Sequence, residues 1–169
     1  MTNNESGMKK NLTNYGDKGF SIFLRKAFIK GLGYSDEMLD KKIIGITNTF
    51  SDYNPCHGNV PDLIKSVKTG ILSNGAIPLE FPTITIHESF ANPTSMYLRN
   101  LMSIDTEEML RAQPMDACVL IGGCDKTVPA QIMGGISADI PIIQLVTGPM
   151  LTGSFRGERV GACTDCRRF

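Results

Sequence analysis

The chain contains 169 residues, of which 41% are hydrophobic and 20% are charged. A chain of this length can bury one substantial core, so a single domain is expected. Its 17 basic residues balance its 17 acidic residues, and the net charge of +0 argues against a nucleic-acid-binding protein. The absence of tryptophan also argues against a surface on which bases stack.

The sequence also argues against a membrane or secreted protein. No apolar run reaches the roughly 18 residues that a membrane helix needs, and the most apolar stretch, 140–151, is interrupted by Pro141, Gly148 and Pro149. The polar first residues are unlike a secretory signal. Five scattered cysteines favour reduced thiols over a disulfide-linked fold. These features predict a soluble, cytoplasmic protein.

Hydrophobic periodicity and capping residues predict the order of the elements. That order is a leader over 1–19, a helix over 20–29, a strand over 43–47, a helix between Asn59 and Gly75, a strand over 83–86, a helix over 96–102, a short helix capped by Asp105, a strand over 117–121, a loop over 122–127, a helix beginning within 129–134, and a strand over 140–146. The continuous apolar run 117–121 is typical of a strand covered on both faces. Alternation of strands and helices predicts the α/β class, with a parallel sheet and helices on both of its faces.

Chemically active residues follow three of the predicted strands. The first loop carries Cys56 and His57, the second carries His87 and Glu88, and the third carries Cys124, Asp125 and Lys126. Ligands of open parallel sheets bind at the carboxyl ends of the strands, so these loops are expected to meet at one edge.

The residue types at this edge favour two different metals. Thiolates suit iron–sulfur clusters or zinc, whereas carboxylates suit magnesium. Zinc usually takes four N or S ligands at short spacings, which the distant Cys56 and Cys124 do not provide. One soft and one hard metal therefore fit these residues better than a single zinc ion.

Simpler readings of the same residues stay open. Glu88 could merely cap the following helix, and Asp125 with Lys126 could be an ordinary surface ion pair. Cys118 lies inside an apolar run and is expected to be a small buried hydrophobe. His57 and His87 stand beside candidate ligands and receive no assignment.

Five segments together resemble the dihydroxy-acid dehydratase and 6-phosphogluconate dehydratase family. These segments are 54–57, 78–82, 93–102, 122–129 and 148–153. The Gly-Gly-Cys-Asp-Lys-Thr element at 122–127 is the most specific of them. The segment 87–89, together with 93–102, resembles the sugar-acid branch, which includes arabinonate and xylonate dehydratases. Branched-chain dihydroxy-acid dehydratase remains the alternative.

The resemblance implies a [2Fe–2S] cluster beside a Mg²⁺ ion. Cys56 and Cys124 match two of the three cluster ligands, while Glu88 and Asp125 match magnesium ligands. Lys126 matches a lysine that becomes carbamylated and binds the same Mg²⁺. The implied function is that of a hydro-lyase, an enzyme that dehydrates a 2,3-dihydroxy acid, such as a sugar acid, to its 2-keto-3-deoxy acid. The implied partners are this small-molecule substrate and, at full length, other copies of the chain, with no nucleic acid or membrane.

The end of the sequence departs from the family pattern. We expect 20–169 to be an N-terminal domain that binds the cluster and magnesium, truncated at its C-terminal end, with the third cluster ligand and the catalytic base in a missing region. On this expectation the chain alone is inactive. Cys163 and Cys166 are not assigned as cluster ligands, and a redox pair or a noncatalytic zinc-binding remnant using them is a further alternative.

Overall fold

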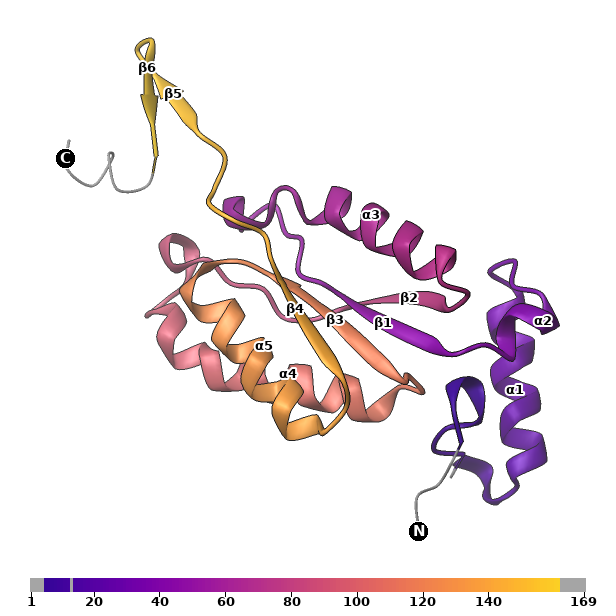
Figure 1. Cartoon of the computed structure of the whole chain (residues 1–169). Helices are drawn as coiled ribbons and strands as arrows, with labels where there is room; N and C mark the ends of the chain where they lie inside the picture. Colours follow the sequence, from indigo (N-terminus) through magenta and orange to yellow (C-terminus); the bar gives the residue numbers. More distant parts are fainter. Residues whose placement is uncertain (1–4, 13, 162–169) are drawn as a thin grey trace.

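The computed structural model describes residues 5–12 and 14–161. Its main sheet has four parallel strands: β1 (Ile43–Asn48), β2 (Ile77–Pro82), β3 (Ala117–Gly122) and β4 (Ile142–Val146). Their order across the sheet is β2-β1-β3-β4 (Figure 1). β1 pairs with β2 along its whole length, from Ile43 opposite Ile77 to Asn48 opposite Pro82.

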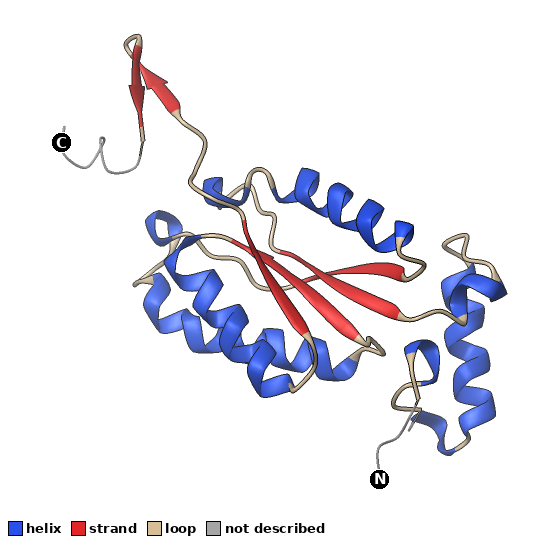
Figure 2. Ribbon diagram, viewed as in Figure 1, coloured by secondary structure: helices blue, strands red, loops and turns tan. Residues whose placement is uncertain are grey.

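Helices cover both faces of this sheet, which confirms the predicted α/β class (Figure 2). α3 (Val60–Ser73) lies on one face, and α4 (Arg99–Ala112) and α5 (Cys124–Ala138) lie together on the other. Two apolar clusters correspond to these layers. Ile46 and Ile121 pack under α3, whereas Cys118 and Leu120 pack on the opposite side of the sheet.

The first part of the chain packs at the amino end of the sheet. It contains two short 3-10 turns, η1 (Gly7–Lys9) and η2 (Asn14–Gly16), and two helices, α1 (Lys18–Lys30) and α2 (Asp36–Leu39). Met8 is buried in the core. The carboxylate of Asp116 accepts hydrogen bonds from the amides of Gly7 and Ile43, which joins this segment to the start of β1.

The predicted strand at 83–86 is wrong. The sheet strand is β2, which ends at Pro82, and residues 83–87 have no regular structure. The β-branched residues favoured a strand, but backbone pairing with β1 selects the preceding segment. Pro78 and Pro82 are tolerated there because β2 is an edge strand.

Two helix boundaries also differ from expectation. The predicted helices on either side of Asp105 are one continuous helix, α4, preceded by the turn η5 (Ser95–Leu98). Asp105 caps no helix; its carboxylate accepts a hydrogen bond from the Ile84 amide at 2.7 Å. α5 begins at Cys124, so the predicted loop residues 124–127 are its first turn and Pro129 lies inside it.

The remaining elements are two turns that follow individual strands of the sheet and a hairpin after β4. Two turns, η3 (Pro55–His57) and η4 (Glu88–Phe90), follow β1 and β2. A hairpin of β5 (Gly153–Phe155) and β6 (Glu158–Val160) projects away from the sheet (Figure 1). Within residues 5–12 and 14–161, no helix has the length and apolar character needed to cross a bilayer.

Candidate metal centre

The candidate residues gather where the chain direction reverses across the sheet. From β1 the chain passes through α3 to β2 on one side, whereas from β3 it passes through α5 to β4 on the other. Open α/β sheets bind ligands at the carboxyl edge of this switch point. Cys56 lies in η3 after β1, and Cys124 opens α5 directly after β3.

Two thiols and an imidazole meet at this edge. The Sγ atoms of Cys56 and Cys124 lie 3.3 Å apart. Ligand atoms of Cys56, Cys124 and His87 all lie within 4.8 Å of one another. Burial, reinforced by the neighbouring Cys124 and the charge of Asp125, raises the pKa of the Cys56 thiol to about 11. A metal that binds there must displace this proton.

The backbone at Cys124 has an unusual conformation. Its φ of 68° lies in the left-handed region, which few residues other than glycine adopt. The preceding Gly123 is extended, and a Cβ there would collide with the hydroxyl of Thr147. A glycine followed by a left-handed cysteine thus directs the Cys124 thiol towards Cys56 at the cost of local strain.

His57 is buried, and its imidazole contacts the backbone on both sides of the thiol pair. The Gly123 amide donates to its Nε2 at 2.8 Å, and its Nδ1 lies 2.8 Å from the carbonyl oxygen of Thr49. Because the Gly123 amide can only donate and the Thr49 carbonyl can only accept, the tautomer with hydrogen on Nδ1 satisfies both contacts. His57 therefore links the loop after β1 to the loop after β3.

A third loop completes this support. The hydroxyl of Thr147, just after β4, donates to the carbonyl oxygen of Cys56 at 3.0 Å. The Asn59 side chain donates to the Thr147 carbonyl oxygen at 2.9 Å. Asn59 is the N-cap residue of α3, as predicted, but its side chain makes this contact and caps no helical amide.

A polar layer lies directly below these loops. The hydroxyl of Thr47 accepts a hydrogen bond from the Ile121 amide at 2.7 Å. The buried amide of Gln131 donates to both the Thr47 hydroxyl and the Ile121 carbonyl. Side chains thus satisfy backbone groups where β1 and β3 diverge, which holds the two thiol-bearing loops at a defined separation.

The acidic residues lie beside the thiols around one lysine. Lys126 Nζ is 2.7 Å from Asp125 Oδ2 and 3.8 Å from Glu88 Oε2. The hydrogen bond that Lys126 donates to Asp125 raises the pKa of Lys126. Hydrogen bonds from Ser95 and then Thr94 lower the pKa of Glu88, helped by the charge of Lys126. The Glu88 carboxylate is therefore a hard oxygen donor, and Asp125 adds a second carboxylate next to Cys124.

The structure also agrees with the simpler interpretations of Glu88 and Cys118. Glu88 does bond the first turn of the following segment, because the amide and hydroxyl of Ser95 in η5 donate to it. Cys118 is 2% exposed, and burial raises the pKa of its thiol to about 12. Cys163 and Cys166 lie outside the described residues.

Sequence reasoning missed the supporting residues. The sequence assigns no role to His57, Thr147 or Gln131. The one available signal was the position of His57 next to a candidate ligand. Hydrogen-bond partners 66 residues apart, such as His57 and Gly123, become visible only in the folded chain.

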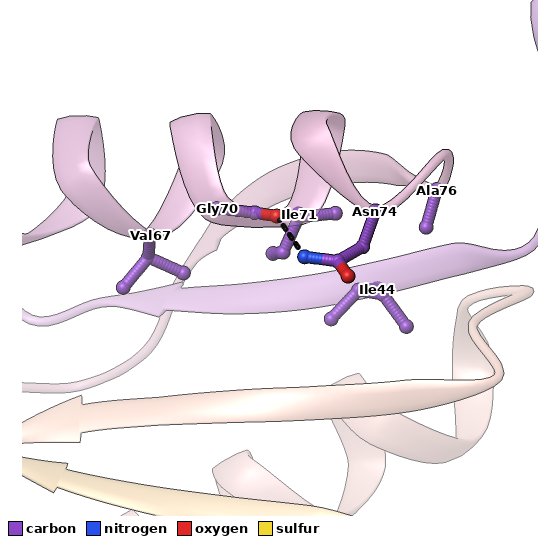
Figure 3. Close-up of a pocket in the computed structure, with 6 residues that line it drawn as sticks. All are labelled: Ile44, Val67, Gly70, Ile71, Asn74 and Ala76. Carbon is purple, nitrogen blue, oxygen red and sulfur yellow. Dashed lines mark hydrogen bonds between the residues drawn. The ribbon is translucent and has the colours of Figure 1, made fainter.

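A surface cavity elsewhere offers no comparable chemistry. It has a volume of about 420 Å³ and lies between the end of α3 and the start of β1 (Figure 3). Its lining consists of Ile44, Val67, Gly70, Ile71, Asn74 and Ala76. None of these side chains titrates, and the Asn74 amide donates to the Gly70 carbonyl within its own helix end.

Comparison of the sequence with models of known protein families finds one match. The family described as "Dihydroxy-acid/6-phosphogluconate dehydratase N-terminal" matches residues 41–168. This match covers most of the chain, including all four strands and the three loops of the candidate site. The chain belongs to the dihydroxy-acid and 6-phosphogluconate dehydratase family, and the part it represents is the N-terminal domain.

Named relatives include dehydratases of two kinds. L-arabinonate dehydratase of Rhizobium leguminosarum is 44% identical over 92% of this chain and 27% of its own length. D-xylonate dehydratase of Caulobacter vibrioides is 41% identical over 85% of this chain and 24% of its own length. Dihydroxy-acid dehydratase of Methanococcus vannielii is 40% identical over 84% of this chain and 27% of its own length. The chain thus spans about a quarter of the length of these relatives.

Proposed function

We propose that this chain supplies the cluster- and magnesium-binding domain of a hydro-lyase that dehydrates a sugar acid. The observation that carries the proposal is the pair of thiols 3.3 Å apart, beside the ion-paired Glu88, Lys126 and Asp125. Family membership supports dehydration as the reaction class. The identity of 44% to L-arabinonate dehydratase, against 40% to dihydroxy-acid dehydratase, favours a sugar acid over a branched-chain dihydroxy acid.

Cys56 and Cys124 would hold an iron–sulfur cluster. Their sulfur atoms lie 3.3 Å apart, and two converging thiols are a donor set that suits a soft metal. A third cysteine ligand and the catalytic base are expected in another part of the longer protein. On this view, the isolated chain has no dehydratase activity.

Glu88, Asp125 and Lys126 would hold Mg²⁺. Glu88 and Asp125 provide the carboxylate oxygens that this ion prefers. Lys126 is a cation in its present ion pairs, so it becomes a ligand only after it loses its proton and its amine reacts with carbon dioxide to give an anionic carbamate. Ser95 and Thr94 fix the direction of the Glu88 carboxylate, which keeps its oxygens turned towards Lys126.

The proposed reaction removes the C2 proton and the C3 hydroxyl of a 2,3-dihydroxy acid as one water molecule. The resulting enol rearranges to the 2-keto-3-deoxy acid. When bound, the cluster and Mg²⁺ supply Lewis acidity for the leaving hydroxyl and charge stabilisation at the substrate carboxylate. The role of this chain's residues is to place the two sites side by side, through His57 and Gly123 for the thiols and Ser95 for Glu88.

Anaerobic reconstitution tests the cluster assignment. The reduced chain is incubated with iron and sulfide, desalted, and assayed for bound iron, bound sulfide and visible absorption. We expect cluster binding by the unmodified chain and by Cys118→Ala, whose thiol is remote from the site. Cys56→Ser and Cys124→Ser are expected to lose most of the bound iron while retaining the circular dichroism of the folded chain.

Two results would contradict the proposal. Full cluster content in the folded Cys56→Ser and Cys124→Ser variants would show that these two thiols do not bind the cluster. Loss of the cluster only after joint replacement of Cys163 and Cys166 would place the metal at the end of the chain and favour the noncatalytic metal-binding alternative.

A further inference from the structure

The helix α1 turns an apolar face towards the outside of the molecule. Its inner face, with Ile22 and Ile29, packs against the core. With about 3.6 residues per turn, the opposite side of the helix is formed by apolar residues alone: Phe20, Phe23, Leu24, Ala27 and Phe28. The three phenylalanines are 49%, 63% and 77% exposed in that order. A surface helix normally turns its polar face to water, so this outer face of α1 is unusual.

The charged side chains of α1 lie beside this face and bond within the chain. Lys26 pairs with Asp40 at 2.8 Å, and Lys30 pairs with Asp36 at 2.6 Å. Arg25 donates hydrogen bonds to three backbone carbonyl oxygens of the segment before α1, and Lys18 contacts a carboxylate of that segment. The outer face of α1 therefore carries no charge that would oppose its burial.

We infer that the outer face of α1 is the contact surface between two copies of this chain. Tyr15 extends the face, because its ring packs edge-on against Phe20 with centroids 5.8 Å apart. At about 150–250 Å² for each aromatic side chain, the exposed parts of these four rings offer roughly 500 Å². A standard interface buries about 800 Å² on each partner. The face thus supplies more than half of what a stable dimer needs.

The spacing of the apolar residues favours a second copy as the occupant. Phe20, Leu24 and Phe28 recur every four residues, so this row is symmetrical about Leu24. Two α1 helices that cross in opposite directions at Leu24 place Phe20 of each copy opposite Phe28 of the other. A twofold interface requires a self-complementary surface of this kind. The small side chain of Ala27 beside the row allows the two helices to approach closely.

The position of α1 in the fold supports the same occupant. α1 lies at the amino end of the sheet, whereas the two thiols lie at its carboxyl edge (Figure 1). The third cluster ligand and the base of the proposed function belong at the carboxyl edge, so they can reach the thiols without covering α1. A cavity of about 350 Å³ next to Phe28, lined also by Leu32 and Leu79, can receive an aromatic ring from the second copy.

Sedimentation equilibrium tests the inference on the reduced 169-residue chain from micromolar to millimolar concentration. We expect a reversible equilibrium between monomer and dimer. Phe23→Asp and Phe28→Asp should each weaken it at least about tenfold, because a charge then replaces a central aromatic contact. Both side chains are largely exposed, so the variants should keep the fold, as circular dichroism and urea unfolding can verify. Phe155→Asp, at an exposed phenylalanine on the hairpin, should dimerise like the unmodified chain.

Cross-linking tests the predicted crossing point. Leu24→Cys places a thiol where the two copies meet, and oxidation with copper phenanthroline should link them through a disulfide. Leu72→Cys is the matched control, since Leu72 is an exposed leucine on α3. Because all chains share the native cysteines, the unmodified chain gives the background. Only Leu24→Cys should produce covalent dimer above that background.

Three results would contradict the inference. A chain that stays monomeric at millimolar concentration would show that the outer face of α1 does not bind a second copy and would favour cover by another part of the longer protein. Dimers that persist in the Phe23→Asp and Phe28→Asp variants, or that are lost equally in Phe155→Asp, would place the contact elsewhere. Stronger cross-linking at Leu72 than at Leu24 would do the same. None of these outcomes bears on the metal ligands of the proposed function.

Discussion

Cys118 is a thiol whose burial makes the stability of the chain depend on pH. Burial raises its pKa to about 12 in the folded protein, whereas the unfolded thiol ionises near its ordinary value of about 9. A raised folded-state pKa contributes stability that is complete below pH 9 and is lost as the pH rises towards 12. We expect the free energy of unfolding, measured with urea, to fall between pH 8 and pH 10.5.

Cys118→Ala is the control for this effect. The substitution should lower stability at pH 8 through lost packing, but the further fall towards pH 10.5 should be smaller than in the unmodified chain. An identical pH dependence in the two chains would contradict the assignment to Cys118.

The two histidines are expected to differ strongly in their contribution to stability. His57→Ala leaves the buried Gly123 amide and Thr49 carbonyl without their partners, and we expect a loss of about 2–4 kcal/mol in urea unfolding. In the metal-free chain, His87→Ala should change stability by less than about 0.5 kcal/mol. Iodoacetamide should also modify Cys56 faster in folded His57→Ala. Equal stabilities of the two variants would show that His57 does not hold the loops together.

At the scale of elements, the contact of α4 with α5 depends on a glycine. A Cβ on Gly134 would lie 2.5 Å from the Ser103 carbonyl oxygen and 2.9 Å from Thr106 Cβ. Because a backbone atom blocks it, the helices must separate, and we expect Gly134→Ala to lower stability by about 1–3 kcal/mol. Thermal and urea unfolding measure this loss.

Gly70 is the matched control in α3. A Cβ at Gly70 meets nothing within 4 Å, so Gly70→Ala should raise stability by roughly 0.5–1 kcal/mol through better helix propensity. A destabilising effect of the same size at both positions would mean that helix packing is not what distinguishes them.

At the scale of the whole molecule, Asp116 connects the amino-terminal segment to the sheet. It receives hydrogen bonds from the Gly7 amide at 3.0 Å and the Ile43 amide at 2.8 Å. Because both donors then lose a charged partner, Asp116→Ala should lower stability by about 2 kcal/mol and accelerate hydrogen exchange at Gly7. Asp40→Ala removes only a surface ion pair with Lys26 and should have a much smaller effect. Unchanged exchange at Gly7 would contradict this connection.

The fold class could be predicted from sequence because local patterns report burial directly. Runs such as 117–121 and the helical spacing after Pro61 depend on neighbouring residues alone, and they correspond to β3 and α3. The strand at 83–86 could not be placed correctly, since pairing of β2 with β1 joins residues 34 positions apart. Local β-propensity describes how a residue fits a sheet and does not select which segment pairs.

The order of elements by itself brought the three loops to one edge, and a motif resemblance assigned their ligands. Sequence determined the residue types: two thiols, two carboxylates, a lysine and two histidines. Only the tertiary structure distinguished the histidines, with His57 enclosed by backbone groups and His87 left beside the thiols. The reason is physical: residue type is local, whereas burial, ring orientation and the 3.3 Å thiol contact depend on chains brought together across the sheet.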